Sequence, residues 1–307
     1  MSAPATPTPD MHEPLEGAGP LISVMMPVYN GGDALVATLA NLRLQTWTDW
    51  EAVILDDGST DQTPSILARF AAADPRMRIH RQDNGGRGVA RNAVLARCRG
   101  ELIFVWDGDD LAGLDTLEQA VTAWRTAGPR SIVFAETLWG FNDDRGIHSD
   151  LRYPWTSALQ HQVGVGQKTV PNPGALIPRA AFAEVGGYDP ALRRCQDAHF
   201  FWRAASAGWK LAPYQPTLFY RMTSPYYHLS YLRDTFHWAG VAKARLANPS
   251  APPDTTPPKL RLLPTVRFFL ARWVAIRRFR ASAVFLAKQQ SLAEVQTAIH
   301  RHLATLP

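Results

Sequence analysis

Three carboxylates gather in the short stretch "FVWDGDD" (104–110), directly after an apolar run. Asp107 and Asp109 are two positions apart, so their side chains point to the same side of an extended backbone. Gly108 between them lets the chain pass close to a ligand. Two hard oxygen ligands on one side suit Mg²⁺ or Mn²⁺, particularly when phosphate oxygens complete the coordination shell. Taken alone, such a sequence forms a solvated turn, with aspartates that cap the following helix, more often than it forms a metal site.

Two further polar clusters follow apolar runs in the same way, "DDGSTD" (56–61) and "DNGGRGVARN" (83–92). The runs themselves predict buried strands, and they alternate with segments whose apolar residues recur at helical spacing. The predicted strands lie within residues 21–28, 51–55, 77–80, 101–106 and 131–136. The predicted helices follow Asp33, begin at Thr63 and Pro64, span about 88–97, and contain Leu117 to Trp124. This alternation predicts an α/β fold with a mostly parallel sheet flanked by helices on both faces.

In such folds ligands bind beyond the carboxyl ends of the strands, so the three polar clusters are expected at one edge of the sheet. Residues 137–180 show no clear periodicity and are interpreted as long loops or a small irregular subdomain. A short helix around "RAAFAEV" and another in "CQDAHFFWRAASAGW", closed by Gly208, are predicted beyond them.

Length and composition limit the classes of protein to which this chain can belong. With 307 residues and 46% hydrophobic content, the chain can bury a substantial core. Its two cysteines, Cys98 and Cys195, are too few and too far apart for a zinc site or a disulfide framework, which favours a cytoplasmic protein with reduced thiols. Residues 1–20 contain five prolines and no apolar run, so a disordered segment is expected there and not a signal peptide. The net charge of +5 is compatible with an anionic partner.

Taken together, the motifs resemble family 2 glycosyltransferases, whose GT-A fold binds a nucleotide-sugar on a parallel sheet. The resemblance covers about residues 21–221 and rests on linked motifs in order: "SVMMPVYNGG", "LDDGSTDQT", "NGGRGVARN", "GELIFVWDGDD" and "EVGGYDP" followed by "QDAHFFW". It implies that a sugar is moved from a nucleotide-diphospho-sugar to an acceptor hydroxyl with inversion, in the synthesis of a polysaccharide, a glycolipid or another cell-surface glycan. The implied donor is a UDP-sugar, and the implied acceptor is a glycan or a lipid-linked molecule.

The resemblance also implies roles for matched positions. The pocket for base and ribose would be lined by Pro27, Tyr29, Asn30, Asp56 and Asp57, with Asp56 or Asp57 accepting from the base if it is uracil. Arg91 would lie near the donor phosphates or sugar. Asp107 and Asp109 would form the DXD pair, both on the metal, with Asp107 also near the ribose. His228 or Arg221 would close over the diphosphate, and His228 is a candidate metal ligand; a surface histidine in a loop explains it at least as well.

The catalytic base implied by the resemblance is Asp197, because a sugar hydroxyl is a poor nucleophile until its proton is removed. Gln196 precedes it where the family has a glutamate. This departure either changes the charge beside the predicted base or changes which acceptor the protein recognises. It also keeps open a rival interpretation, a non-catalytic nucleotide-sugar binding or scaffold protein of the same fold. A simple helix N-cap is an equally good explanation of Asp197 without the upstream motifs.

The C-terminal part divides at a proline-rich linker, residues 248–258, after a predicted glycosyltransferase domain of residues 21–247. Residues 259–307 are predicted to form a basic helical extension, and between Lys259 and Lys288 it carries eight basic residues and no acid. Peripheral contact with the inner face of a membrane is one interpretation, and packing on the catalytic domain is the other. The segment has few aromatic residues between its charges, which weighs against nucleic acid as a partner.

Overall fold

The structure of the chain, a computed structural model, describes residues 21–142, 146–221, 229–250 and 283–305. A seven-stranded sheet lies at its centre, in the order β10-β6-β9-β4-β1-β2-β3, and every strand is parallel to its neighbours except β9, which runs antiparallel between β4 and β6. Its strands are β1 (Ile22–Val28), β2 (Trp50–Asp57), β3 (Met77–Gln82), β4 (Leu102–Val105), β6 (Ser131–Ala135), β9 (Leu176–Pro178) and β10 (Lys210–Tyr214).

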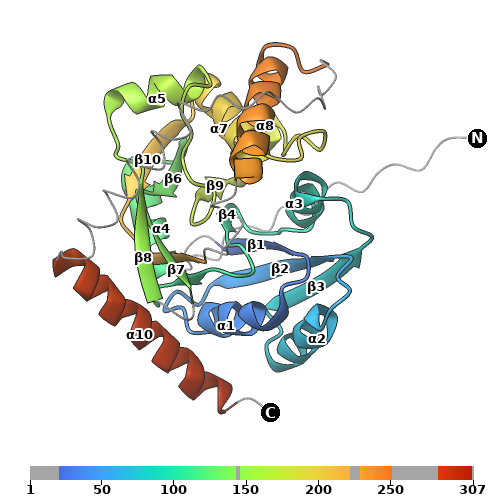
Figure 1. Cartoon of the computed structure of the whole chain (residues 1–307), viewed down its shortest axis with the longest axis vertical. Coiled ribbons are helices and arrows are strands. Elements are labelled where there is room, and N and C mark those ends of the chain that lie inside the picture. The colour runs from blue at the N-terminus through green and yellow to red at the C-terminus, as the bar shows by residue number, and fades with distance from the viewer. Residues whose placement is uncertain (1–20, 143–145, 222–228, 251–282, 306–307) are drawn as a thin grey trace, which may run out of the picture.

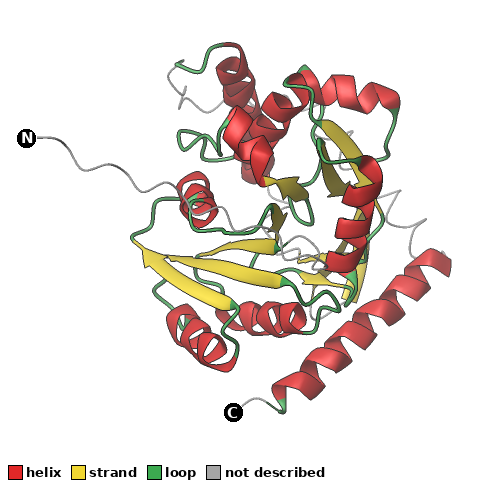
Figure 2. Ribbon diagram, turned by 180° about the vertical axis from the view of Figure 1, so that it is seen from behind, coloured by secondary structure: helices red, strands yellow, loops and turns green. Residues whose placement is uncertain are grey.

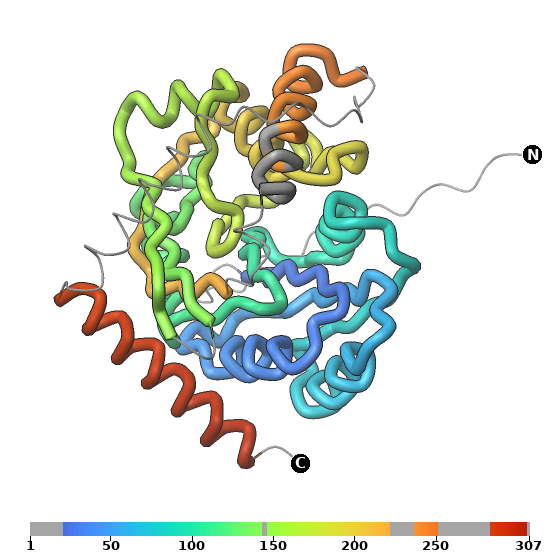
Figure 3. Tube along the Cα trace, in the orientation of Figure 1, coloured from blue at the N-terminus to red at the C-terminus, as the bar shows by residue number. Residues whose placement is uncertain are grey.

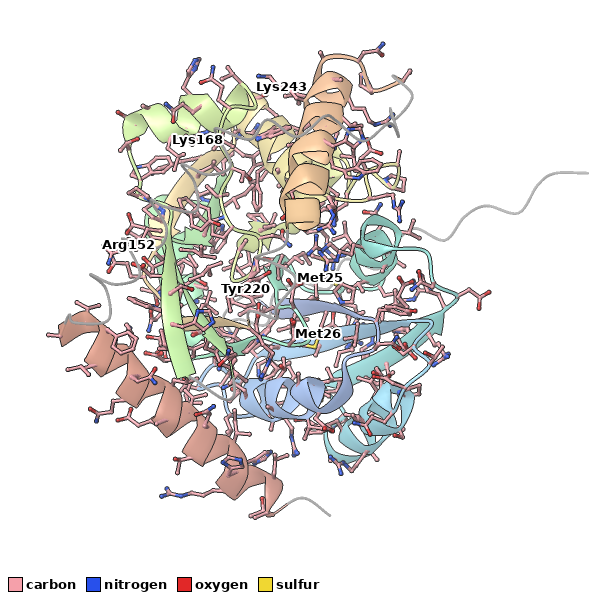
Figure 4. The ribbon with its side chains drawn as sticks, in the orientation of Figure 1. Met25, Met26, Arg152, Lys168, Tyr220 and Lys243 are labelled. Carbon is pink, nitrogen blue, oxygen red and sulfur yellow. The ribbon has the colours of Figure 1, made fainter. Side chains whose placement is uncertain are left out.

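Helices cover both faces of this sheet (Figure 1). On one face lie α1 (Gly32–Arg43), α2 (Thr63–Ala73), α4 (Thr116–Ala127) and α10 (Ala283–Leu303). On the other lie α3 (Arg87–Leu95), α5 (Ser157–Gly164), α6 (Arg179–Val185), α7 (Gln196–Ser206) and α8 (Leu229–Ala247). The alternation of side chains along a strand explains the two cores: Met25 and Met26 are neighbours on β1, both fully buried, and each belongs to a different core (Figure 4). The predicted α/β fold is confirmed.

A second, four-stranded sheet was not predicted. Its order is β5-β11-β7-β8, and it consists of β5 (Leu111–Ala112), β11 (Leu218–Arg221), β7 (Thr137–Asn142) and β8 (Gly146–Arg152). The first part of residues 137–180, expected to be irregular, therefore supplies two of its strands. Figure 2 shows, from behind, the strands of the molecule lying between groups of helices. Because β5 follows the "DGDD" stretch directly and pairs with β11, the second sheet fixes the position of that stretch.

The C-terminal helix α10 packs on the domain. Leu292, Val295 and Ile299 are buried in the same core as α1, and Gln289 accepts a hydrogen bond at 2.7 Å from the backbone N–H of Ile147 on the edge strand β8. Figure 3 shows the helix running along the outside of the molecule. The packing interpretation thus holds for residues 283–303, whereas most of the linker and the basic segment 259–282 lie outside the described residues. In the described ranges no helix is long and apolar enough to cross a membrane.

Candidate active site

The loops that follow β1 and β2 are joined by hydrogen bonds. The backbone N–H of Asn30 donates to Ser59 Oγ at 2.8 Å, and the Asn30 side-chain oxygen accepts from the Thr60 N–H at 2.9 Å. Asn30 adopts a left-handed backbone conformation, with φ 50°, that an asparagine tolerates better than most residues. Pro27, half-buried near the end of β1, and Tyr29, which is 53% exposed, flank this junction. The loop residues predicted to bind the donor are therefore held together at one edge.

Asp56 and Asp57 are both buried, and each carboxylate organises a loop. Asp56 accepts from the backbone N–H of Ser59 at 2.8 Å and forms an ion pair with Arg81. Asp57 accepts from the backbone N–H groups of Gly85 and Gly86, at 2.9 and 3.0 Å, and from the side chain of Gln82. Because each oxygen already has a protein donor, either aspartate would bind a base only through its remaining lone pairs. Both aspartates position the loops of the predicted donor pocket.

The "DGDD" stretch is held from the second sheet. Asp110 is buried, and one of its carboxylate oxygens accepts from the Arg221 N–H at 2.9 Å. The guanidinium of Arg221 donates to the backbone oxygen of Asp109 at 2.9 Å. Burial raises the pKa of Asp110 well above its usual range, and the neighbouring carboxylates raise it further. The third aspartate of the stretch therefore has a structural position, whereas Asp107 and Asp109 are partly accessible.

Asp107 and Asp109 are close enough to affect each other. Burial, and next the charge of Asp107, raise the pKa of Asp109 to about 6. A pair of carboxylates that disfavour each other's charge fits a divalent cation, which relieves this repulsion. Among the described residues no group of three acidic, histidine or cysteine side chains could hold a metal by itself. This donor set matches Mg²⁺ or Mn²⁺, which bind through one or two carboxylates and take further oxygens from phosphates.

Arg91, from α3, lies between "DGDD" and the start of α7. Its Nη2 is 3.5 Å from Asp107 Oδ1, and its guanidinium lies 5.4 Å from the centre of the Tyr188 ring. The side chain is buried, which opposes its charge, yet the nearby Asp107, Tyr188 and Asp197 hold its pKa above the ordinary value. Asp107 and Asp197, 90 positions apart in the chain, are thus brought within electrostatic reach of one cation.

Asp197 lies in the first turn of α7, and its Oδ1 accepts from the Ala198 N–H at 2.9 Å. The helix begins at Gln196, and the capping position is Cys195, in a left-handed conformation with φ 59°. Asp197 is consequently not the helix N-cap that the simpler interpretation of the sequence predicted. Its carboxylate is partly accessible, at the same edge of the sheet as Asp107.

The structure brings together Pro27, Tyr29, Asn30, Asp56, Asp57, Arg91, Asp107, Asp109 and Asp197 at the carboxyl ends of the strands. His228 lies outside the described residues. Sequence reasoning gave no role to Arg87, at the start of α3, which lowers the pKa of Asp109 through its charge. The sequence did contain a signal for this residue. A cation in the first turn of a helix is disfavoured by the helix dipole, so an arginine at that position indicates a role other than stabilising the helix.

The model of the family described as glycosyl transferase family 2 matches residues 23–186, more than half of the chain. The chain belongs to this family. A similar family relative is a putative teichuronic acid biosynthesis glycosyltransferase, TuaG, from Bacillus subtilis (strain 168), which is 32% identical over 158 residues, or 49% of this chain and 61% of that protein. The chain covers only part of the curated relatives that it matches, between 11% and 61% of the length of three of them.

Solved structures show that this family 2 member has the fold of known glycosyltransferases. S. aureus TarS 1–349 in complex with UDP-GlcNAc is 18% identical, with a TM-score of 0.58 over 93% of this chain and 84% of that one. The mannosyltransferase PcManGT from Pyrobaculum calidifontis, in complex with GDP-Man and Mn²⁺, is 20% identical, with a TM-score of 0.57 over 97% of this chain and 79% of that one.

Proposed function

We propose that this family 2 member is an inverting, metal-dependent glycosyltransferase that moves a sugar from a nucleotide-diphospho-sugar to an acceptor hydroxyl. The observation that carries the proposal is the meeting of Asp107 and Asp197 around Arg91. A direct displacement needs a site for the leaving diphosphate on one side of the reacting carbon and a base on the other side. The carboxylate pair at 107 and 109 supplies the first, and Asp197 supplies the second.

Each residue then has a chemical task. Asp197 takes the proton from the acceptor hydroxyl as the new bond to the anomeric carbon forms. Arg91 and Arg221 make charge-assisted hydrogen bonds to phosphate oxygens and orient the leaving group. Asp107 and Asp109 would hold Mn²⁺ or Mg²⁺, which when bound neutralises charge on the departing diphosphate. Asp56 and Asp57 keep the loops around base and ribose in place.

The nucleotide and the pathway are further parts of the proposal. A UDP-sugar is the favoured donor, because a carboxylate at Asp56 or Asp57 can accept from the uracil N–H through a free lone pair. TarS supports this choice, since it was solved with UDP-GlcNAc, whereas PcManGT was solved with GDP-Man. A glycan or a lipid-linked molecule is the proposed acceptor, and synthesis of a cell-surface polysaccharide is the proposed context, as the name of TuaG suggests for that protein.

A thermal-shift screen tests the donor site. UDP, GDP, dTDP and their sugar derivatives are compared with and without Mn²⁺, on the wild-type protein and on Asp109→Ala. We expect stabilisation by one nucleotide class that requires the metal and is lost in the variant, because ligands that bind only the folded state raise its stability. Absence of any shift at saturating nucleotide would contradict the proposal. Donor binding without nucleoside diphosphate release, with any acceptor, would favour the non-catalytic binding protein.

Peripheral contact with the inner face of the cytoplasmic membrane is proposed for the basic segment within residues 259–282, on its charge alone. Vesicle co-sedimentation tests it with the full-length protein and a variant in which Arg277, Arg278 and Arg280 are changed to Gln. Binding to anionic vesicles that weakens in the variant and in high salt is expected. Equal, negligible binding of both proteins would rule it out.

A further inference from the structure

Arg221 on β11 makes two hydrogen bonds to the stretch that contains Asp107 and Asp109. Its backbone N–H donates to Asp110 Oδ1 at 2.9 Å, and its side-chain Nε donates to the backbone oxygen of Asp109 at 2.9 Å. Asp110 is 3% exposed and Arg221 is 7% exposed, so both bonds are shielded from water, and a donor that lost its acceptor would be left unsatisfied. The side chain of Asp110 and the peptide of Asp109 are therefore held by one residue.

Arg221 is in turn held by the second sheet. It pairs in register with Phe141 on β7, and its guanidinium lies 4.7 Å from the centre of the Phe141 ring. Phe219, two positions earlier on β11, packs edge-on against the same ring with 6.3 Å between the ring centres, and it pairs with Leu111 on β5. The strand that carries Arg221 is therefore paired on both sides before it reaches the "DGDD" stretch.

Further contacts hold the same stretch from α1, β1 and the end of β4. The backbone oxygen of Asp110 accepts from Thr38 Oγ1 at 3.0 Å and from Trp106 Nε1 at 3.2 Å. Gly108 leaves no room for a side chain, because a Cβ there would lie 2.9 Å from Val28 Cγ2. The residues on either side of the second aspartate of the pair are consequently anchored, and the position of its backbone depends on them.

The affinity of a metal site depends on such anchoring. Mg²⁺ in particular requires near-ideal octahedral geometry, and a single glycine separates Asp107 from Asp109, so the spacing of the two carboxylates follows the backbone. Changing a residue that orients a metal ligand typically costs about tenfold to a hundredfold in affinity. We propose that Asp110 is a positioning residue of the metal site, and that its bond to Arg221 fixes the backbone of Asp109 and thereby sets the affinity for the divalent cation. This inference rests on the proposed function.

Two substitutions of Asp110 separate the hydrogen bond from the charge. Asp110 Oδ2 has no hydrogen-bond partner in the part of the chain that the structure describes, so Oδ1 alone carries the contact. Asp110→Asn removes the charge but keeps an oxygen that accepts from the Arg221 N–H, whereas Asp110→Leu removes the charge and the acceptor together. The difference between these two variants isolates the hydrogen bond. Asp110→Ala, which is smaller than the aspartate, replaces Asp110→Leu if the latter does not fold.

Lys288 on α10 supplies a control at the other end of β11. Its Nζ donates to Thr217 Oγ1 at 2.7 Å, one residue before the strand begins, and lies 5.7 Å from the centre of the Trp139 ring. Lys288→Met keeps most of the aliphatic side chain and breaks the bond, so it loosens the second sheet without touching Asp110 or Arg221. A merely structural role of Asp110 predicts that substitutions at either residue change the melting temperature and leave the metal affinity unchanged.

Electron paramagnetic resonance of free Mn²⁺ measures the metal affinity at equilibrium, without turnover. Mn²⁺ is titrated into the wild type, Asp110→Asn, Asp110→Leu and Lys288→Met, alone and with UDP, GDP or dTDP, and the same nucleotide without protein serves as the blank. We expect Asp110→Leu to bind Mn²⁺ about tenfold more weakly than Asp110→Asn, the lower end of the range for residues that orient a ligand. Lys288→Met should stay within about twofold of the wild type.

The outcomes separate this inference from the proposed function. If the wild type binds Mn²⁺ and Asp110→Leu binds it as tightly as Asp110→Asn, the bond to Arg221 does not position the metal site, and the inference is wrong while the proposed function stands. If Lys288→Met weakens Mn²⁺ binding as much as Asp110→Leu, the effect is a general loosening of the second sheet, and the inference is wrong as well. If the wild type binds Mn²⁺ neither alone nor with any of the three nucleotides, the proposed metal-dependent function fails and the inference fails with it.

Discussion

The guanidinium of Arg91 lies 3.5 Å from the carboxylate of Asp107, with its Nε buried and, among the described residues, unpartnered. Asp107 comes from the loop after β4, and Arg91 from the middle of α3. The negative charge of Asp197, from α7, also acts on this guanidinium. One buried cation therefore links the proposed metal-binding carboxylates to the proposed base, and the two halves of the reaction depend on the same side chain.

Arg91→Met should impair both the proposed metal-binding carboxylates and the proposed base. The substitution keeps an unbranched side chain about as long as the aliphatic part of arginine but removes the charged guanidinium, so Asp107 and Asp197 lose a shared partner. We expect a stability loss of roughly 1 to 3 kcal/mol, below the usual range for a buried ion pair because Asp107 is partly exposed, and a fall in turnover of about a hundredfold. Chemical denaturation and nucleoside diphosphate release measure the two effects.

Arg91→Lys is the matched control. It retains the charge but not the planar pair of donors, so its stability and turnover should fall between those of the wild type and Arg91→Met. Wild-type turnover in Arg91→Met would show that this cation has no part in the reaction.

Asp57 is predicted to act through the loop that it holds. Asp57→Asn places an amide N–H against the backbone N–H of Gly86, so the loop should loosen and nucleotide affinity should fall by about tenfold or more. Limited proteolysis near Gly85 and titration with UDP report the two changes separately. If affinity falls while the loop stays as resistant as in the wild type, Asp57 contacts the nucleotide directly and its positioning role is secondary.

The sequence predicted five of the seven strands of the main sheet, all but β9 and β10, because these five are apolar runs, and it predicted the polar edge because three of them end in a distinct polar cluster. It did not predict the second sheet. In β8, "GIHSDLR", most side chains are polar, and β7, "TLWGFN", is interrupted by Gly140, so neither shows the pattern of a buried strand. The antiparallel strand β9 was missed for another reason. It is only three residues long, and its pairing with β4 is a long-range contact that no local signal specifies.

Glu51 should make the stability depend on pH. Burial opposes its charge, but hydrogen bonds from Ser23, from the backbone and side chain of Arg99 and from Arg78 outweigh burial and hold its pKa below the ordinary 4.5. A lowered pKa means that the contribution is complete above pH 4.5 and is lost as the pH falls further. Unfolding free energies from pH 7 to pH 3 should therefore decline less steeply in Glu51→Gln, from a lower starting value.

Glu101→Gln provides a comparison for this experiment, because Glu101 is exposed. Its profile should follow that of the wild type. A wild-type profile for Glu51→Gln as well would show that the buried network does not depend on the charge of Glu51.

The two thiols should be unreactive in the folded protein. Burial, and next the charge of Glu51, raise the pKa of Cys98 to about 12, and burial followed by Asp197 raises that of Cys195 to about 12. Because the thiolate is the reactive form, labelling by a disulfide reagent at pH 8 should be about a thousandfold slower than for an ordinary thiol. Two thiols should react on unfolding. Fast labelling of the native protein would contradict the buried position of Cys98 or the shielding of the half-buried Cys195.

The central claim is that Asp197 is the base of a sugar transfer. The most direct measurement is the rate of nucleoside diphosphate release, with the donor found by the screen and a pool of glycan and lipid-linked acceptors, for the wild type and Asp197→Asn, together with the donor dissociation constant of each. The proposed mechanism predicts a rate lower by about a hundredfold or more in the variant, with donor affinity within about twofold of the wild type. A variant that turns over at the wild-type rate would show that Asp197 is not the base.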